Sequence, residues 1–247
     1  MSYERTDAIT IRYAEYSETS RVMTFFTRRF GRLVVLAKGV KRRYSRAIGH
    51  VDLFSHCELV FVSRGQRDRM HIFSEAAAQE TFPRIRRSLP GYYAACHAAA
   101  LVENMTAEED PNEELFEELL LVMRRLNKGV NPALALFAFE ARLLALCGFL
   151  PELGRCVSCG KERRGRGVAF SPARGGIMCR DCAPGEPDLI ERVSPGALGL
   201  LARLAAGKTT RLDRIRLSPA AAKRIRTFLN QYETYTLGKE LRTLRHL

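Results

Sequence analysis

The cysteines that could bind a metal stand in two tight pairs, Cys156 with Cys159 and Cys179 with Cys182. Two residues separate the members of each pair, and residues 160–178 separate the pairs. A C-x2-C turn aims both sulfurs at one point, and two such turns supply the four thiolates of a tetrahedral zinc site. A redox C-x-x-C motif and a pair of disulfides are the alternatives. The spacing favours one structural Zn2+ ion held by all four cysteines, because four thiolates leave no position open for a catalytic water.

No familiar catalytic pattern accompanies these cysteines. The five histidines form no H-E-x-x-H or H-x-x-x-H pair, and the sequence contains no Walker loop, no G-x-G-x-x-G and no G-x-S-x-G. Asp52 is the only acid near the basic stretch described next, so a carboxylate cluster for catalytic magnesium is not visible there. We therefore expect a binding protein and not an enzyme.

The charge of the chain points to a polyanionic partner. Its net charge is +13, from 40 Lys and Arg against 27 Asp and Glu, and nucleic acid is the commonest large polyanion. Residues 28–51 contain no Asp or Glu. This stretch supplies cations for phosphate contacts and one ring on which a base could stack, and we predict that it binds DNA through Arg28, Arg32, Lys38, Lys41, Arg42, Arg43, Tyr44 and Arg46. A solvated loop without a ligand is the alternative.

Further charge lies toward the C-terminus. Residues 203–226 form a second basic block in which Asp213 is the only acid, and three more arginines stand between the cysteine pairs at positions 163, 164 and 166. For both groups, nucleic-acid contact and an ordinary solvated face remain open. The acids concentrate at residues 108–118, where we expect them to support a helix N-terminus and solubility.

The elements that must position these residues change in type at residues 80–83. Short alternating or β-branched segments predict strands at 8–13, 22–27, 33–37, 57–62 and 70–73. Five strands in this length predict an OB-type barrel over residues 1–81.

Residues 82–247 are predicted to form a mostly α-helical domain that carries the zinc module at about 151–186. Helix signals cover 91–105 and 111–127, Asn131-Pro132 opens a helix that runs to Cys147, and Ser194-Pro195 and Ser218-Pro219 open two more. The expected fold class is therefore α+β.

The chain has 247 residues, enough for two domains, and no apolar run reaches the about 20 residues of a bilayer span. Its charged N-terminus does not look like a signal peptide. We therefore expect a cytoplasmic protein with reduced thiols and no membrane partner. The remaining cysteines, Cys57, Cys96 and Cys147, lie in apolar surroundings and are expected to be buried.

In order and spacing, several segments resemble the RecO family of bacterial recombination mediators over nearly the whole length. They are the stretch from Gly31 to Arg46, Phe54, residues 143–151 leading to Cys156-Val157-Ser158-Cys159-Gly160, and Phe170-Ser171 with Gly175-Gly176 before Cys179. The resemblance implies an N-terminal OB fold followed by a helical domain with a zinc-binding insertion. It also implies that the basic OB surface lies at Lys38, Lys41, Arg42, Arg43 and Arg46. Many members have proline or another basic residue where Tyr44 stands, so its stacking role is our inference.

The same resemblance implies a function in DNA repair and homologous recombination. It implies binding to single- and double-stranded DNA and annealing of complementary strands. Together with RecR, the chain would load the recombinase onto DNA coated with single-stranded-DNA-binding protein, at the bacterial nucleoid. A zinc-containing nuclease or base-processing enzyme on DNA, and an RNA-associated zinc module, are the rival functions.

Overall fold

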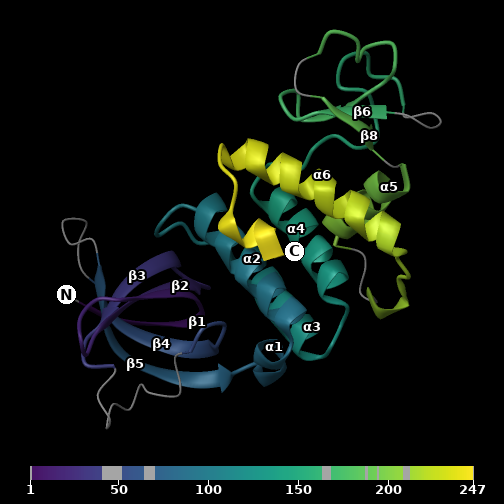
Figure 1. Cartoon of the computed structure of the whole chain (residues 1–247). Helices are drawn as coiled ribbons and strands as arrows, with labels where there is room; N and C mark the ends of the chain where they lie inside the picture. The colour runs from purple at the N-terminus through teal and green to yellow at the C-terminus, as the bar shows by residue number, and fades with distance from the viewer. Residues whose placement is uncertain are drawn as a thin grey trace. The chain divides into compact units, whose positions relative to one another are not determined.

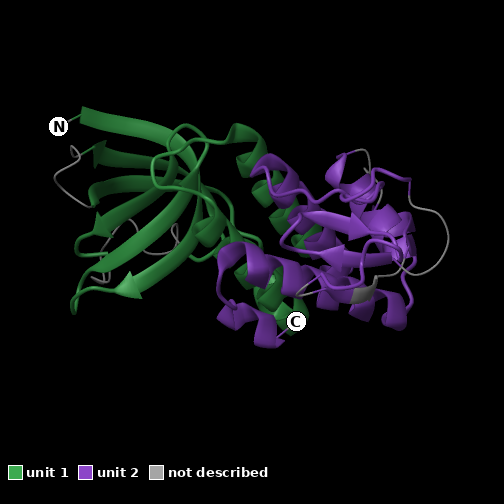
Figure 2. Cartoon of the chain, turned by 90° about the horizontal axis from the view of Figure 1, so that it is seen from above, with its two compact units in different colours: residues 1–129 green, residues 130–247 purple. Residues whose placement is uncertain are grey.

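The structure is a computed structural model that describes residues 2–40, 52–63, 70–162, 168–186, 189–193, 195–207 and 212–246. It contains two compact units, Met1–Gly129 and Val130–Leu247, which Figure 2 colours separately. The first unit holds the strands of the N-terminal region together with the helices that follow them. Five of the predicted DNA-binding residues lie outside the described residues, namely Lys41, Arg42, Arg43, Tyr44 and Arg46.

Five strands of the first unit form a closed barrel in the order β1-β2-β3-β5-β4. They are β1 (Ser2–Glu15), β2 (Arg21–Thr27), β3 (Gly31–Ala37), β4 (His56–Ser63) and β5 (His71–Glu80). The long strand β1 closes the barrel because its first half pairs with β4 and its second half pairs with β2. β3 and β5 pair in parallel, and the other neighbours are antiparallel. These features confirm the predicted OB-type barrel (Figure 1).

The barrel encloses one apolar core. Alternate residues of β2, β3 and β4 point inward, and the core includes Phe25, Leu33, Val35, Leu59 and Phe61, each at most 2% exposed. This alternation is the period-two pattern from which the strands were predicted.

Three helices complete the first unit: α1 (Pro83–Arg87), α2 (Leu89–Met105) and α3 (Glu113–Asn127). The side chain of Ser88 accepts a hydrogen bond from the Gly91 amide at the start of α2, and Asn112 does the same for Leu115 in α3. Acids fill the first turn of α3 and arginines its last turn, as the helix dipole favours. The predicted helices at 91–105 and 111–127 are confirmed.

The second unit combines three α-helices with a small sheet. The helices are α4 (Pro132–Leu146), α5 (Pro195–Ala205) and α6 (Pro219–Leu237), and two 3-10 turns, η1 (Leu212–Arg214) and η2 (Arg242–His246), accompany them. The sheet has the order β7-β6-β8, with β6 (Val168–Ser171), β7 (Gly176–Met178) and β8 (Ile190–Val193). The sequence predicted no strands beyond residue 73, so this sheet is an addition.

In the helices of the described ranges, no segment combines the length and the apolar character that a membrane span requires.

Candidate functional site

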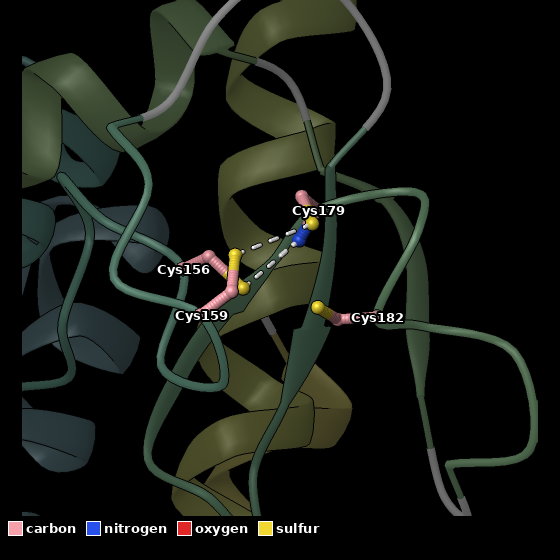
Figure 3. A group of neighbouring side chains, drawn as sticks. All are labelled: Cys156, Cys159, Cys179 and Cys182. Carbon is pink, nitrogen blue, oxygen red and sulfur yellow. Dashed lines mark hydrogen bonds between the residues drawn. The ribbon is translucent and has the colours of Figure 1, made fainter.

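The four predicted metal ligands converge at one point of the second unit. The sulfurs of Cys156, Cys159, Cys179 and Cys182 all lie within 4.8 Å of one another, and Figure 3 shows them facing a common centre. The Cys159 and Cys179 sulfurs are 3.8 Å apart. A tetrahedral ion with metal–sulfur bonds of about 2.3 Å would separate its sulfurs by about 3.8 Å. The quartet therefore has the dimensions of a four-thiolate metal site.

Backbone contacts bring the two cysteine pairs together before any metal is considered. In the first turn the Gly160 amide donates to the Cys156 carbonyl at 2.9 Å, and in the second the Cys182 amide donates to the Cys179 carbonyl at 3.1 Å. The Val157 amide then donates to the carbonyl of Ile177 in β7 at 2.9 Å, which fixes the first turn beside the strand that leads into Cys179. The sheet thus aligns the two turns.

Gly176 permits this close approach. A Cβ at this position would overlap the Val157 side chain and lie 2.9 Å from the Glu152 carbonyl oxygen. Gly176, the first residue of β7, is therefore a packing requirement of the metal module.

The thiols of the quartet differ in acidity. Burial acts to raise the pKa of Cys156, but backbone amides of Cys179, Cys159 and Ser158 hydrogen-bond to its sulfur and bring the pKa down to about 6. The Cys179 thiol raises the pKa of Cys182 to about 12. Four neighbouring thiolates repel one another, so a cation among them is needed for all four to be deprotonated.

All seven cysteines of the chain are free thiols in the structure. The 3.8 Å between the Cys159 and Cys179 sulfurs is far longer than a disulfide bond of about 2.05 Å. Away from the quartet, Cys57 is buried as predicted, whereas Cys96 and Cys147 are only partly buried. Burial raises the pKa of all three thiols, which makes them poor metal ligands at neutral pH.

The predicted DNA-binding stretch leaves the barrel at the end of β3. Lys38 is exposed there, and Gly39 takes a left-handed conformation with φ of 67°. The Gly39 amide donates to the Ser20 hydroxyl at 3.4 Å, and Val40 is 7% exposed within the barrel core. The barrel therefore anchors the start of this stretch, and Lys41 to Arg46 come next in the sequence.

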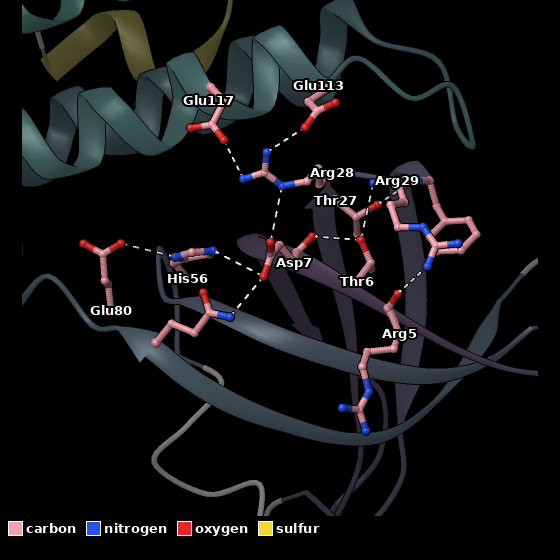
Figure 4. Close-up of polar contacts among 12 residues, drawn as sticks. Arg5, Thr6, Asp7, Thr27, Arg28, Arg29, His56, Glu80, Glu113 and Glu117 are labelled. Atoms are coloured by element: carbon pink, nitrogen blue, oxygen red, sulfur yellow. Dashed lines mark hydrogen bonds and ion pairs between the residues drawn. The ribbon is translucent and has the colours of Figure 1, made fainter.

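Arg28, one of the predicted DNA contacts, is enclosed by carboxylates (Figure 4). Its guanidinium pairs with Asp7 at 3.3 Å, with Glu113 at 2.8 Å and with Glu117 of α3, and it lies over the Phe116 ring. The Glu113 hydrogen bond is the largest influence on Arg28 and raises its pKa. This environment gives Arg28 a part in joining the barrel to α3, and a DNA phosphate would have to displace its partners.

Arg32, another predicted DNA contact, is similarly held. Its side chain is 15% exposed, pairs with Glu108 at 3.1 Å and donates to the Thr106 carbonyl oxygen at 3.3 Å. Its backbone carbonyl accepts a hydrogen bond from the Glu109 amide at 3.0 Å. Arg32 therefore fixes the connection between α2 and α3 on the barrel. The acids at 108–118, which we expected to serve a helix N-terminus and solubility, also hold these two arginines.

Most of the described arginines of the first unit form an ion pair with an Asp or Glu side chain. Asp52, which the sequence placed near the basic stretch, pairs with Arg86 at 2.9 Å. Glu80, at the end of β5, accepts three hydrogen bonds from Arg124 and one from His56, and the Arg124 bonds are the largest influence lowering its pKa. Both carboxylates are therefore engaged by arginines.

The second basic block, residues 203–226, divides into an exposed and a buried part. Arg226 pairs with both oxygens of Glu140, at 2.6 and 2.9 Å, and the Glu140 side chain is fully buried. Arg226 also lies over the Phe137 ring. This arginine therefore stabilises the packing of α6 on α4. The other described cations of the block are exposed, and Lys208 and Arg211 lie outside the described residues.

Two family models match the chain, and together they span nearly all of it. The model described as Recombination protein O N terminal matches residues 1–82, and the one described as Recombination protein O C terminal matches residues 86–245. The chain belongs to the RecO family. Residues 83–85, at the start of α1, lie between the two matched ranges. The RecO N-terminal model therefore covers the barrel, and the C-terminal model covers the helices from α2 onward and the cysteine quartet.

Individual RecO proteins are similar over almost the full length. The DNA repair protein RecO of Roseiflexus sp. (strain RS-1) is 35% identical over 243 residues, which cover 98% of this chain and 84% of that protein. The DNA repair protein RecO of Pelotomaculum thermopropionicum is 35% identical over 247 residues, which cover 100% of this chain and 94% of that protein. The DNA repair protein RecO of Syntrophus aciditrophicus is 31% identical over 252 residues, which cover 98% of this chain and 94% of that protein. RecO is thus a family of DNA repair and recombination proteins, and the predicted resemblance is confirmed.

Proposed function

We propose that this RecO-family chain binds single- and double-stranded DNA through the basic stretch that follows β3. In this proposal Lys38, Lys41, Arg42, Arg43 and Arg46 contact phosphates, and Tyr44 stacks on a base. The observation that supports it most is a contrast within the first unit. Lys38 is exposed where the chain leaves β3, whereas Arg28 and Arg32 are held by carboxylates. Among these three predicted contacts, Lys38 is therefore the one most available to DNA.

Annealing is the activity that such a surface can support without any bond chemistry. Two complementary strands repel each other through their phosphates, and this repulsion slows their encounter. A basic surface neutralises phosphates, releases counterions and raises the local concentration of strands. Base pairing between the strands then supplies the free energy. We propose on this ground that the chain is a recombination mediator and not an enzyme.

We further propose that the chain acts with RecR to load a recombinase onto DNA coated with single-stranded-DNA-binding protein, in the bacterial cytoplasm at the nucleoid. Membership of the RecO family and the basic charge of the chain support DNA as a partner. RecR and the single-stranded-DNA-binding protein are carried over from the family resemblance alone. A pull-down of the full chain with each purified partner, with and without DNA, would test them.

The cysteine quartet is proposed to hold one structural Zn2+ ion. The dimensions of the quartet fit zinc, which would supply a crosslink between the two turns, so that its binding energy becomes folding energy. The role of the chain's own residues here is to hold the turns beside β7. The proposed DNA site is the stretch that follows β3, and not the metal module.

Fluorescence anisotropy with a labelled oligonucleotide tests the proposed DNA site. Each phosphate contact on a single strand contributes about 0.7 to the slope of log affinity against log salt. The double variant Arg42→Gln/Arg43→Gln should therefore bind more weakly and lower the magnitude of that slope by about 1.4. Unchanged affinity and slope would refute the assignment. Incubation of the same oligonucleotide with magnesium tests the nuclease alternative, which predicts cleavage, and competition with RNA tests the RNA-associated alternative.

A further inference from the structure

The exposed cations around the start of α6 have no acid partners among the described residues. We call Arg214, Arg216, Lys223 and Arg224 the η1–α6 cations. All four residues are exposed. Exposed arginines elsewhere in the chain commonly pair with an acid, as Arg155 does with Glu162 and Arg174 with Glu186 in the same unit. Among the described residues, no ion pair neutralises the η1–α6 cations. Their charge therefore contributes to the net charge of +13.

Chain geometry keeps these cations close together. Arg214 and Arg216 are two residues apart, and Arg216 is three residues before Pro219, where α6 begins. An extended residue spans at most about 3.6 Å, and an α-helix rises about 1.5 Å per residue. The backbone from Arg214 to Arg224 therefore covers at most about 25 Å. A DNA strand carries one phosphate per about 3.4 Å of duplex, so this surface matches a run of several phosphates.

The surface is also held in place by the packing behind it. α6 buries Ile225, Phe228, Leu229 and Tyr232 in the second unit. The ring of Phe170 from β6 packs on Phe228 with the ring centroids 4.8 Å apart. Arg226, between the exposed and buried sides of α6, is fixed by its ion pair with Glu140. Lys223 thus stands opposite the buried side of an ordered helix, and Arg224 stands on the flank of the same helix.

We propose that the η1–α6 cations bind the sugar-phosphate backbone of a second DNA strand. This inference rests on the proposed annealing function and assigns the first strand to the stretch that follows β3. Two strands held on one protein meet at a high effective concentration. Asp213 is the only acid from residue 203 to residue 226, so this part of the sequence is strongly basic. Phosphate contact needs positive charge without base-specific geometry, which suits exposed Lys and Arg side chains.

Capture of two strands by the full chain tests this proposal. Two non-complementary oligothymidines, one with a donor dye and one with an acceptor dye, report co-capture as energy transfer, while anisotropy with one oligonucleotide reports the first site. The triple variant Arg216→Gln/Lys223→Gln/Arg224→Gln should keep its affinity for one oligonucleotide within about twofold. Its co-capture and its annealing rate should fall at least tenfold, because about three phosphate contacts are lost.

A matched control removes the same charge from the same unit. Lys239, Arg242 and Arg245 are exposed beyond the C-terminal end of α6, and their triple change to glutamine should leave co-capture unchanged. Charge-preserving Arg216→Lys/Arg224→Lys should also retain co-capture, since lysine binds phosphate as a point charge. Thermal melting by circular dichroism would show that both triple variants are folded.

Two results would overturn the inference while leaving DNA binding by the chain intact. The first is co-capture by the η1–α6 triple variant at the level of the unaltered chain. The second is loss of binding even to a single oligonucleotide, which would make this surface the first site. Failure of the unaltered chain to bind any DNA would instead overturn the proposed function itself.

Discussion

Replacing Arg28 by glutamine separates a structural arginine from a DNA contact. Arg28 is 27% exposed and touches three carboxylates, Asp7, Glu113 and Glu117, as well as the Phe116 ring. The two glutamates are largely exposed, so we assign about 0.5 kcal/mol to each pair, and about 1 kcal/mol to the more enclosed Asp7 pair. Arg28→Gln should therefore lower the free energy of unfolding by about 2 kcal/mol.

The assay combines unfolding with DNA binding on the same samples. The chain contains no tryptophan, so urea unfolding is best followed by circular dichroism at a wavelength that reports helix and strand. Affinity for a labelled single strand, measured at a low urea concentration where the variant is folded, should match that of the unaltered chain.

The matched control for this prediction is Arg43→Gln, in the stretch proposed to bind DNA. An exposed ion pair is worth up to about 1 kcal/mol, so this variant should bind DNA up to about fivefold more weakly with unchanged stability. If Arg28→Gln weakened DNA binding by a similar factor and left stability unchanged, the structural reasoning about the carboxylate partners would be refuted.

Three further predictions concern the metal module and the ion pairs. Cys156→Ser should lose bound zinc and lower the melting temperature by about 5 °C or more, whereas Cys147→Ser should retain the metal in a colorimetric zinc assay. Gly176→Ala should lower zinc occupancy without touching a ligand, because the added Cβ crowds the Glu152 carbonyl; full occupancy would contradict the packing argument. Glu80 has a lowered pKa in the folded chain, so its stabilising effect is complete above about pH 4.3 and is lost as the pH falls through the lowered value. Glu80→Gln should therefore be less stable than the unaltered chain at pH 7 and similar to it near pH 2, and equal stability at pH 7 would contradict the ion pair.

The elements that sequence predicted well are those with local signals. Asn112, Asn131 and Ser218 cap α3, α4 and α6 because their side chains bond to amides three residues ahead, and that spacing is visible in the sequence. The cysteine quartet was also predictable, since metal coordination constrains both the type and the spacing of its residues.

Strand ends depended on partners that lie far away in the chain. β5 extends to Glu80 through Ala76, Ala77 and Ala78, which have little intrinsic preference for strands. Pairing with Leu59, Glu58 and Cys57 of β4 holds them extended. The prediction stopped at residue 73 because no local pattern records this pairing.

The long-range ion pairs were invisible for the same reason. Arg28 meets Glu113 across 85 positions, and Arg226 meets Glu140 across 86. In the sequence both arginines look like members of basic surfaces. A charge cluster therefore indicates which region attracts DNA, but only the folded structure separates the arginines that are exposed from those that support the fold.

The rate of annealing of two complementary labelled strands tests the central claim most directly. The measurement follows loss of donor fluorescence with magnesium present, over a series of salt concentrations, and a denaturing gel checks the strands for cleavage. The account predicts that the unaltered chain accelerates pairing, that added salt suppresses the effect, and that Arg42→Gln/Arg43→Gln largely removes it while every strand stays intact. Cleaved strands, or acceleration that the double variant retains in full, would contradict it.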